Sequence, residues 1–525
     1  MKLLRYLPFG LLPLAAGCAG SEALDNGQID TPGGSVNVVQ GGAQDIALFR
    51  SIVEQGQVPT PDTLDPVGFF AEHAIDLPDA DCGKEICIHP YLAVAPRFNG
   101  GNWTMAFVAM NTPVDPSELD RPPVHMTIAV ESSTFTNITP SMFQAGVEGL
   151  IASLRPEDRV SFVVYGDHAQ RKLLLGEPGS EEVSNAITAV VEDLTFTSTN
   201  AALFDGIAAA ATTFEDGYAE GFVGDTRLLL VTSGHATIGI TNTDHILEMG
   251  EAIVEQGSAF GVIGVGTQFD AKIPSALGSM GAGTYAYAAD SNDLSGLLTE
   301  EGQTTLYPLA TEFNLTIKPS AGYKIGRIYG TKRAGYGPEG AVLSMPALFI
   351  GQRDGASDVG GSRRGGGGGL FVELLFDESS SGGVGADAPA FQVSADWKSA
   401  EDGAPQLTDL TMINSLPPGQ NPDEMWWNLS DGGSGKQYMM LNMYLALRGA
   451  VDFYQTGDCA RALGVIDMMQ TPVGAWLGQY SDTDIQDDNL LMLQLRQNIQ
   501  NACSASQSTT VPIEPTNFSG GCCYS

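Results

Sequence analysis

The chain has 525 residues, of which 62 are acidic and 25 are basic, and its formal charge at pH 7 is −37. This excess would repel the phosphates of a nucleic acid, and no basic stripe offsets it, so neither DNA nor RNA is an expected partner. A chain of this length is expected to form roughly two to four compact units.

The segment 1–18 has the pattern of an export signal. Lys2 and Arg5 precede an apolar run over 7–16, which is too short to span a membrane. Small residues then lead into Cys18, a pattern that resembles the bacterial lipobox; an ordinary signal peptide that contains a cysteine is the alternative. The resemblance implies a protein anchored in the bacterial cell envelope by a lipid on Cys18. Because Ala19 rather than aspartate follows, the outer membrane is favoured.

Two segments precede the main α/β pattern. Residues 19–43 are rich in Gly, Ser and Asp, which predicts a flexible tether. The next unit, 44–120, is predicted to contain a short helix over 44–58 and another around Phe69 and Phe70. Strands are expected over 91–112, where apolar side chains alternate with others.

Residues 121–302 change to repeated strand–helix units. Nearly uniform apolar runs predict strands covered on both faces, as in a doubly wound parallel sheet with a Rossmann-like α/β arrangement. The ligand crevice of such a sheet lies beyond the carboxyl ends of its strands. The expected strands are 125–131, 159–165, 227–232, 259–265 and 284–288, and the expected helices are 140–154, 181–193, 201–214, 243–256 and 291–299.

The remainder is predicted to contain a β domain followed by helices. A period of two returns over 303–415, and its Gly-rich breaks predict exposed loops in a β-sandwich-like domain. Because strands also precede the α/β domain, that domain is expected to be inserted beside the sandwich. The region 416–505 is predicted to be helical, with a helical hairpin that docks on the β domain, and 506–525 is a tail. The helices are expected at 436–456, 458–470 and 484–502.

Six cysteines remain when Cys18 is set aside. Export to an oxidising compartment predicts disulfides, and zinc is the alternative, although no histidine pair has ligand spacing nearby. The sequence does not fix the pairing. The disulfide candidates are Cys82, Cys87, Cys459, Cys503, Cys522 and Cys523.

Short motifs of the α/β domain follow one another in a characteristic order. They are Pro122-Pro123, Asp158-Arg159-Val160, Thr199-Asn200, Leu228 to Thr232 with Gly234, Gly264-Val265-Gly266, and Gly281 to Tyr285. In this order they resemble the motifs of a von Willebrand factor type A (VWA) domain. The flanking segments resemble those of bacterial lipoproteins that contain such a domain.

The resemblance implies a site at the strand ends, where the family holds a divalent cation through D-x-S-x-S, a threonine and an aspartate. Glu131, Ser133 and Phe135 stand at the D-x-S-x-S positions, Thr199 is kept, and Ser233 replaces the aspartate. The extra methylene of Glu131 is expected to push its carboxylate outward, and Phe135 offers no oxygen. We therefore expect no tight binding of Mg²⁺ or Ca²⁺ and no cofactor. The residues that would hold such an ion are Glu131, Ser133 and Thr199.

The leading hypothesis is a non-catalytic envelope lipoprotein whose VWA domain binds a protein or a surface polymer. Its expected contact rim is Glu131, Ser133, Thr199, Ser233 and His235. A structural or assembly scaffold of the envelope is the alternative. A hydrolase is a third hypothesis, but no H-E-x-x-H, G-x-S-x-G or complete Walker A motif occurs. Ser233 and His235, two positions apart in a loop, are not expected to face each other as a catalytic pair.

Overall fold

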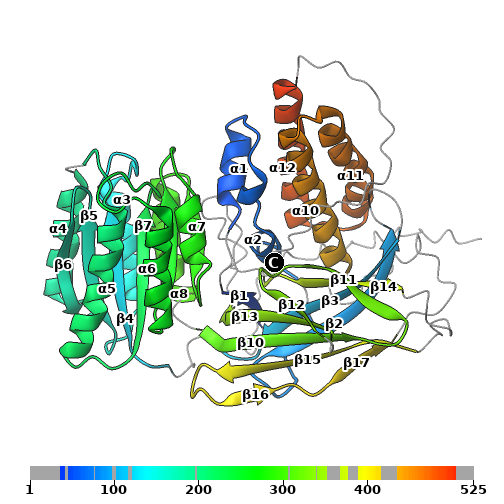
Figure 1. Ribbon diagram of the computed structural model, residues 1–525, viewed down its shortest axis with the longest axis horizontal. Coiled ribbons are helices and arrows are strands. Elements are labelled where there is room, and N and C mark those ends of the chain that lie inside the picture. The colour runs from blue at the N-terminus through cyan, green and yellow to red at the C-terminus, as the bar shows by residue number, and fades with distance from the viewer. Residues whose placement is uncertain are drawn as a thin grey trace, which may run out of the picture.

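The computed structural model describes residues 36–41, 45–75, 77–96, 98, 102–115, 121–195, 198–304, 308–337, 340–351, 367–376, 388–414 and 434–503. The predicted export signal with Cys18, the tail with Cys522 and Cys523, and most of both Gly-rich breaks lie outside these residues. Figure 1 shows two bodies side by side, an α/β body formed by 121–304 and a β–helix body formed by the rest.

The α/β body has a six-stranded sheet in the order β6-β5-β4-β7-β8-β9. All neighbouring pairs are parallel except β5 and β6. Every residue of β4 is buried, as the uniform apolar pattern predicted. The strands are β4 (Val124–Glu131), β5 (Arg159–Tyr165), β6 (Ala169–Gly176), β7 (Asp225–Thr232), β8 (Ala259–Val265) and β9 (Thr284–Ala288).

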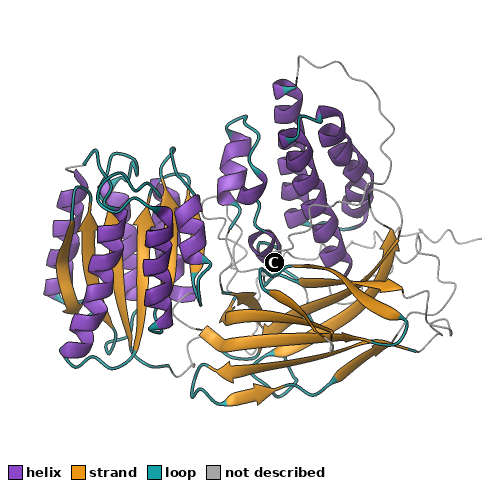
Figure 2. Cartoon of the chain, in the orientation of Figure 1, coloured by secondary structure: helices purple, strands orange, loops and turns teal. Residues whose placement is uncertain are grey.

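Helices cover both faces of this sheet, which confirms the doubly wound α/β class (Figure 2). Helices α3 (Pro140–Ala152), α4 (Glu181–Thr195) and α8 (Ser291–Thr304) pack on one face. Helices α5 (Leu203–Ala219), α6 (Thr243–Glu255) and α7 (Lys272–Gly278) pack on the other. The sequence predictions missed β6 and α7. β6 is a half-exposed edge strand with charged residues, and α7 has only 7 residues, so neither gives a clear apolar period.

The β–helix body contains two packed layers of antiparallel strands joined through β1 (Val36–Gln40), which pairs with both β3 and β13. One layer holds β2 (Cys87–Pro96), β3 (Asn102–Thr112), β11 (Tyr323–Tyr329) and β14 (Leu370–Phe376). The other holds β10 (Pro308–Pro319), β12 (Ala334–Gly337), β13 (Gly340–Ile350), β15 (Pro389–Ser399), β16 (Pro405–Leu407) and β17 (Thr411–Asn414). Since β3 precedes the α/β body and its partner β14 follows it, the predicted insertion is confirmed.

Strand β3 shows how the layers are stacked. Ala106, Val108 and Met110 join the core between the two layers of strands. Met105 and Phe107 face the opposite way and join a core with the helices. That core contains residues of α1 (Ala47–Glu54), α2 (Pro66–Ala71), α10 (Ser434–Gln455), α11 (Cys459–Gln479) and α12 (Thr483–Ala502). A 3-10 turn at Pro61–Thr63 connects α1 to α2. The helices therefore dock on the β layers, as expected.

Two predicted segment boundaries are wrong. The predicted tether over 19–43 ends in β1, whose register with Thr112 and Ile350 places it inside the β layers. The helix expected to stop at 470 continues through Pro472 to Gln479. Val473 and Trp476 are buried in the helical core, and this packing outweighs the hydrogen bond that the proline cannot donate.

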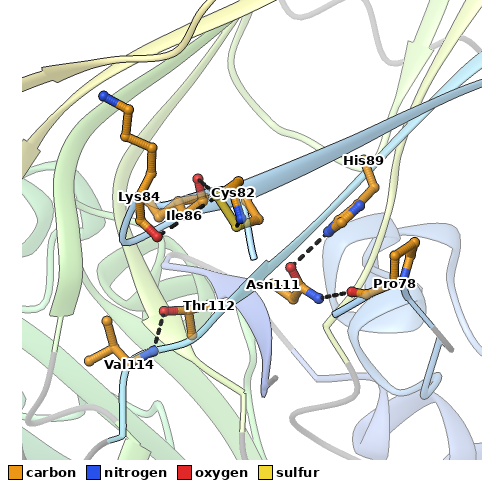
Figure 3. The surroundings of a disulfide bond; sticks show 9 residues. Pro78, Cys82, Lys84, Ile86, His89, Asn111, Thr112 and Val114 are labelled. Carbon is orange, nitrogen blue, oxygen red and sulfur yellow. Dashed lines mark hydrogen bonds between the residues drawn. A yellow bond between two sulfur atoms is a disulfide. The ribbon is translucent and has the colours of Figure 1, made fainter. Parts of the chain in front are cut away.

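Two disulfides join cysteines that the sequence offered as candidates. Cys82 pairs with Cys87 and Cys459 with Cys503, across Cα distances of 5.7 and 6.2 Å. The first lies at the start of β2 (Figure 3). Nearby, Asn111 of β3 donates to the Pro78 carbonyl at 2.7 Å and meets His89 Nε2 at 2.8 Å.

Polar contacts fasten the two bodies to each other. Asp45, just before α1, accepts a hydrogen bond from the Tyr287 amide of β9 at 3.3 Å. Lys332, beyond β11, pairs with Asp65 at 2.8 Å and donates to Ser279 of the α/β body at 3.1 Å. No helix within the described residues is long and apolar enough to cross a lipid bilayer.

A buried histidine makes the α/β body sensitive to acid. His125 of β4 is fully buried beside Ser161 Oγ at 2.7 Å, and this burial lowers its pKa from 6.5 to about 4. Because the unfolded chain takes up this proton first, the stability is complete above pH 6.5. It should fall by about 3 kcal/mol as the pH drops toward 4. His125→Gln, which stays neutral and can still reach Ser161, should have a flatter profile in urea unfolding between these pH values. If the free energy of unfolding depended equally on pH in the natural protein and in His125→Gln, the acid sensitivity would not come from His125.

Candidate functional site

The loops after β4 and β7 and the loop between α4 and α5 meet at the carboxyl edge of the parallel sheet, beside the end of β5. The Ser132 amide donates to the Tyr165 carbonyl, and the Thr134 amide donates to the Ser198 carbonyl, both at 2.8 Å. The Thr237 amide donates to the Ala201 carbonyl at 3.0 Å. The structure therefore brings the loops that carry the five predicted rim residues to one edge, as strands of a doubly wound sheet require.

Glu131, at the end of β4, connects the loops after β4 and β7 through its carboxylate. Its Oε1 accepts hydrogen bonds from the hydroxyls of Ser133 and Ser233, the latter at 2.7 Å. Its Oε2 accepts from the Thr232 hydroxyl at 2.9 Å and the Ser233 amide at 2.8 Å. The expectation that the longer side chain pushes the carboxylate outward is wrong. Glu131 is fully buried because the extra methylene lets it reach across to the end of β7.

Tyr165, at the end of β5, completes the surroundings of this carboxylate. Its hydroxyl donates to Glu131 Oε2 at 3.5 Å. Burial, and then the negative charge of Glu131, raise the pKa of the Tyr165 phenol well above its ordinary value of 10.0. The phenol therefore keeps its proton and acts as a further donor.

These residues do not fit a divalent cation of the kind that the family holds. Ser133 Oγ donates to Glu131 and accepts from the Phe135 amide at 3.1 Å, so its proton and one of its two lone pairs are already used inside the protein. Ser233 Oγ likewise donates to Glu131. Thr199, the third residue expected to ligate, is exposed. Within the described residues no group of three His, Cys, Asp or Glu could hold a metal ion.

The missing ligands can be restored as a test. Millimolar Mg²⁺ should leave the melting temperature of the natural chain unchanged, because a ligand stabilises only the state that binds it. The variant Glu131→Asp/Phe135→Ser/Ser233→Asp regains the oxygen set and should melt higher in Mg²⁺ than in EDTA. Calorimetry with both ions measures this. A clear Mg²⁺ effect on the natural chain would contradict the misfit.

Phe135 and His235 lie above this buried network, partly exposed. Their ring centroids are 4.8 Å apart. His235 Nε2 donates to the Gln268 carbonyl at 2.6 Å, whereas the hydroxyl of buried Ser233 donates to Glu131. The two side chains therefore do not form the nucleophile–base pair of the hydrolase hypothesis, as expected from their spacing. The family motif marks Phe135 only as a position without a ligand oxygen, whereas in the structure it is the large apolar side chain of this loop.

Two further apolar residues of the edge were missed. Ile238 and Ile240, in the loop after β7, are 39% and 40% exposed. The Ala201 amide donates to Thr237 Oγ1 at 2.7 Å, and the Thr237 amide donates back to the Ala201 carbonyl. These two hydrogen bonds fix the loop next to the two isoleucines. The sequence signal was a pair of isoleucines in an otherwise small and polar loop. We call Phe135, Thr199, His235, Ile238 and Ile240 the edge patch.

Two glycines let the loops under the edge patch approach each other. Gly266 has a φ of +96°, and a Cβ there would lie 2.2 Å from the Phe135 carbonyl oxygen. Gly234 has a φ of +79°, and a Cβ there would lie 1.9 Å from the Asp270 carbonyl oxygen. Only glycine accepts both the left-handed backbone and the close contact.

Comparison with known proteins gives distant likenesses of fold. No family model matches the chain, and no curated protein matches it. Among solved structures, a von Willebrand factor type A protein from Catenulispora acidiphila is 13% identical with a TM-score of 0.45, over 76% of this chain and 88% of that one. An aerotolerance-related membrane protein from Bacteroides fragilis is 16% identical with a TM-score of 0.28, over 34% and 98%. BatB from Bacteroides thetaiotaomicron is 18% identical with a TM-score of 0.26, over 34% and 96%.

The sheet order and the positions of the strand-end loops define the class of this chain. It contains a doubly wound α/β unit, inserted into a two-layered β domain that carries helices on one face.

Proposed function

We propose that the chain is a non-catalytic envelope lipoprotein that binds a partner protein through the edge patch without a metal ion. The observation that carries this proposal is the hydrogen-bonded carboxylate of Glu131. Its network with Ser133, Thr232 and Ser233 joins the loops after β4 and β7 at the edge through hydrogen bonds of the chain itself. Those three partners are buried and support the contact surface from below.

The chemistry of the edge patch supports a protein partner. It combines two aromatic rings, a hydroxyl and two exposed isoleucines on loops that are fixed to the sheet. Aromatic and aliphatic side chains surrounded by polar ones are typical of the centres of protein interfaces. A rigid surface also binds with a smaller loss of conformational entropy than mobile loops do.

Site-specific photo-cross-linking in the native envelope tests the contact. A photoreactive phenylalanine analogue at Ile238 should give a discrete cross-linked product, and Phe135→Ala or His235→Ala should weaken it. The matched control is the same analogue at Val223, which is 82% exposed at the opposite edge of the sheet. EDTA should leave the product unchanged. Cross-linking that is equal at both positions, or that EDTA abolishes, would contradict the proposal.

The lipid anchor is a separate part of the proposal and rests on the lipobox-like sequence ending at Cys18. Mass spectrometry of the mature N-terminus should find acyl chains on Cys18, and Cys18→Ser should release the protein from the membrane fraction. An unmodified N-terminus at another residue would contradict this part alone.

A further inference from the structure

A cavity of about 540 Å³ opens beside the edge patch, at the carboxyl ends of β8 and β9. It lies between the start of α3 and the start of α8. Thr136 lines it and directly follows Phe135 of the edge patch, and Gly266, which approaches the Phe135 carbonyl, lines it as well. A partner that covers Phe135 would therefore also cover the mouth of this cavity.

The walls of the cavity are fixed in place by a pair of hydroxyls. The Thr139 amide donates to Ser291 Oγ at 3.0 Å, and the Ser291 hydroxyl donates to Thr139 Oγ1 at 2.9 Å. These bonds hold the starts of α3 and α8 together. Ile138, Met142 and Leu294 contribute apolar surface between them. The cavity can thus hold a chain of methylene groups without rearrangement.

The charge at the cavity is negative. Asp290, which lines it, accepts the amides of Asn292 and Asp293 through Oδ1, at 2.7 and 3.0 Å. Asp293 accepts the amides of Ala289 and Asp290 through Oδ2. Each carboxylate thus keeps one oxygen with no hydrogen bond to the described part of the chain. Among the described residues that line the cavity, Asp290 is the charged one, and no basic residue lines it. Behind it, burial and then the charges of Asp290 and Glu54 raise the pKa of Asp293.

We propose that this cavity receives a basic side chain, arginine or lysine, from the partner protein. The methylene groups of that side chain would lie against Ile138, Met142 and Leu294, and its cationic head would meet Asp290. This inference rests on the proposed function, which it extends by naming the chemistry of the partner. The two aspartates also favour the N-terminus of α8, a role that any acidic residue fulfils there. That role at the helix start explains the aspartates, but it does not explain the cavity beside Asp290.

Methyl NMR of the full chain with ¹³C-labelled methionine tests the proposal, because Met142 lines the cavity. The probe is capped Gly-Arg-Gly, and its matched control is the same peptide with neutral citrulline. The arginine peptide should shift the Met142 signal at millimolar concentration, and the citrulline peptide should not. Asp290→Asn keeps a capping side chain and should weaken binding about tenfold, because the charge-assisted contact is lost.

Two more variants make the outcome decisive. Asn292→Trp, at the exposed start of α8, should fill the cavity and abolish the shift. Asp244→Asn, an exposed acidic residue in the first turn of α6, should leave it unchanged. Equal binding of both peptides, or equal loss in both aspartate variants, would overturn the proposal. If the peptide binds as expected but Ile238 gives no cross-link, the cavity stands and the proposed function fails. A cross-link that survives Asp290→Asn undiminished overturns the cavity proposal alone.

Discussion

Replacing Glu131 by alanine should destabilise the α/β body by about 3 to 5 kcal/mol. The change leaves the hydroxyls of Thr232 and Ser233 and the Ser233 amide without their acceptor inside the protein. It also removes the atoms that hold the ends of β4 and β7 together. No tryptophan lies between Trp103 and Trp397, so tryptophan fluorescence does not report on this body. Hydrogen exchange of peptides from β4 and β7, followed by mass spectrometry, measures the loss locally.

The isosteric variant separates the charge of Glu131 from its shape. Glu131→Gln keeps one oxygen for Thr232 and the Ser233 amide, and its NH₂ group can donate to the two serine hydroxyls. The expected loss is therefore only about 1 kcal/mol. Asp205→Ala, in the exposed first turn of α5, is the control and should change little. An alanine variant at 131 as stable as the natural chain would show that the carboxylate does not hold the edge together.

The layered architecture could be predicted because buried parallel strands leave a strong signal. Strand β8 has no polar residue, β4 is buried along its whole length, and helices with an apolar stripe separate the strands of this body. The edge strand β6 leaves no such signal, because one side of it faces solvent. β1 was missed for a different reason. It is short, and only its partners β3 and β13, far along the chain, determine that it is a strand.

The candidate site could be predicted in its position but not in its details. Glu131 ends one parallel strand and Ser233 follows another, so the topology places both at the carboxyl edge of the sheet. The resemblance to a known family, rather than the position of a strand, places Thr199 beside them. Whether Glu131 turns inward depends on donors from β7, which lies about a hundred residues further on, and spacing along β4 does not reveal them. The exposure of Ile238 likewise depends on how Thr237 pins its loop to Ala201. Side-chain direction is decided by tertiary contacts that a sequence pattern does not contain.

A second buried charge cluster lies where α1, α12 and the end of α2 meet, in the β–helix body. Asp488 of α12 accepts from Arg50 of α1 at 2.9 Å through Oδ1, and it meets His73 Nε2 at 2.8 Å through Oδ2. Arg50 also donates to Glu72 at 2.6 Å, and His73 Nδ1 faces the Phe69 carbonyl at 2.9 Å. Asp488 and His73 are fully buried. One carboxylate thus joins the N-terminal helices to the last helix, which lies more than 400 residues later in the chain.

Replacing Asp488 by alanine should therefore destabilise the helical layer by about 3 to 5 kcal/mol, because Arg50 and His73 would be left buried beside an incomplete set of acceptors. Asp487→Ala, its exposed neighbour on α12, is the matched control and should lose less than about 0.5 kcal/mol. Hydrogen exchange should speed up in α1, α2 and α12 of the Asp488 variant and stay unchanged in α3 and α4, since the α/β body has its own core. If α3 and α4 exchanged faster to the same extent, the two bodies would unfold together. The contacts of Asp45 and Lys332 would then couple their stabilities as well as join their surfaces.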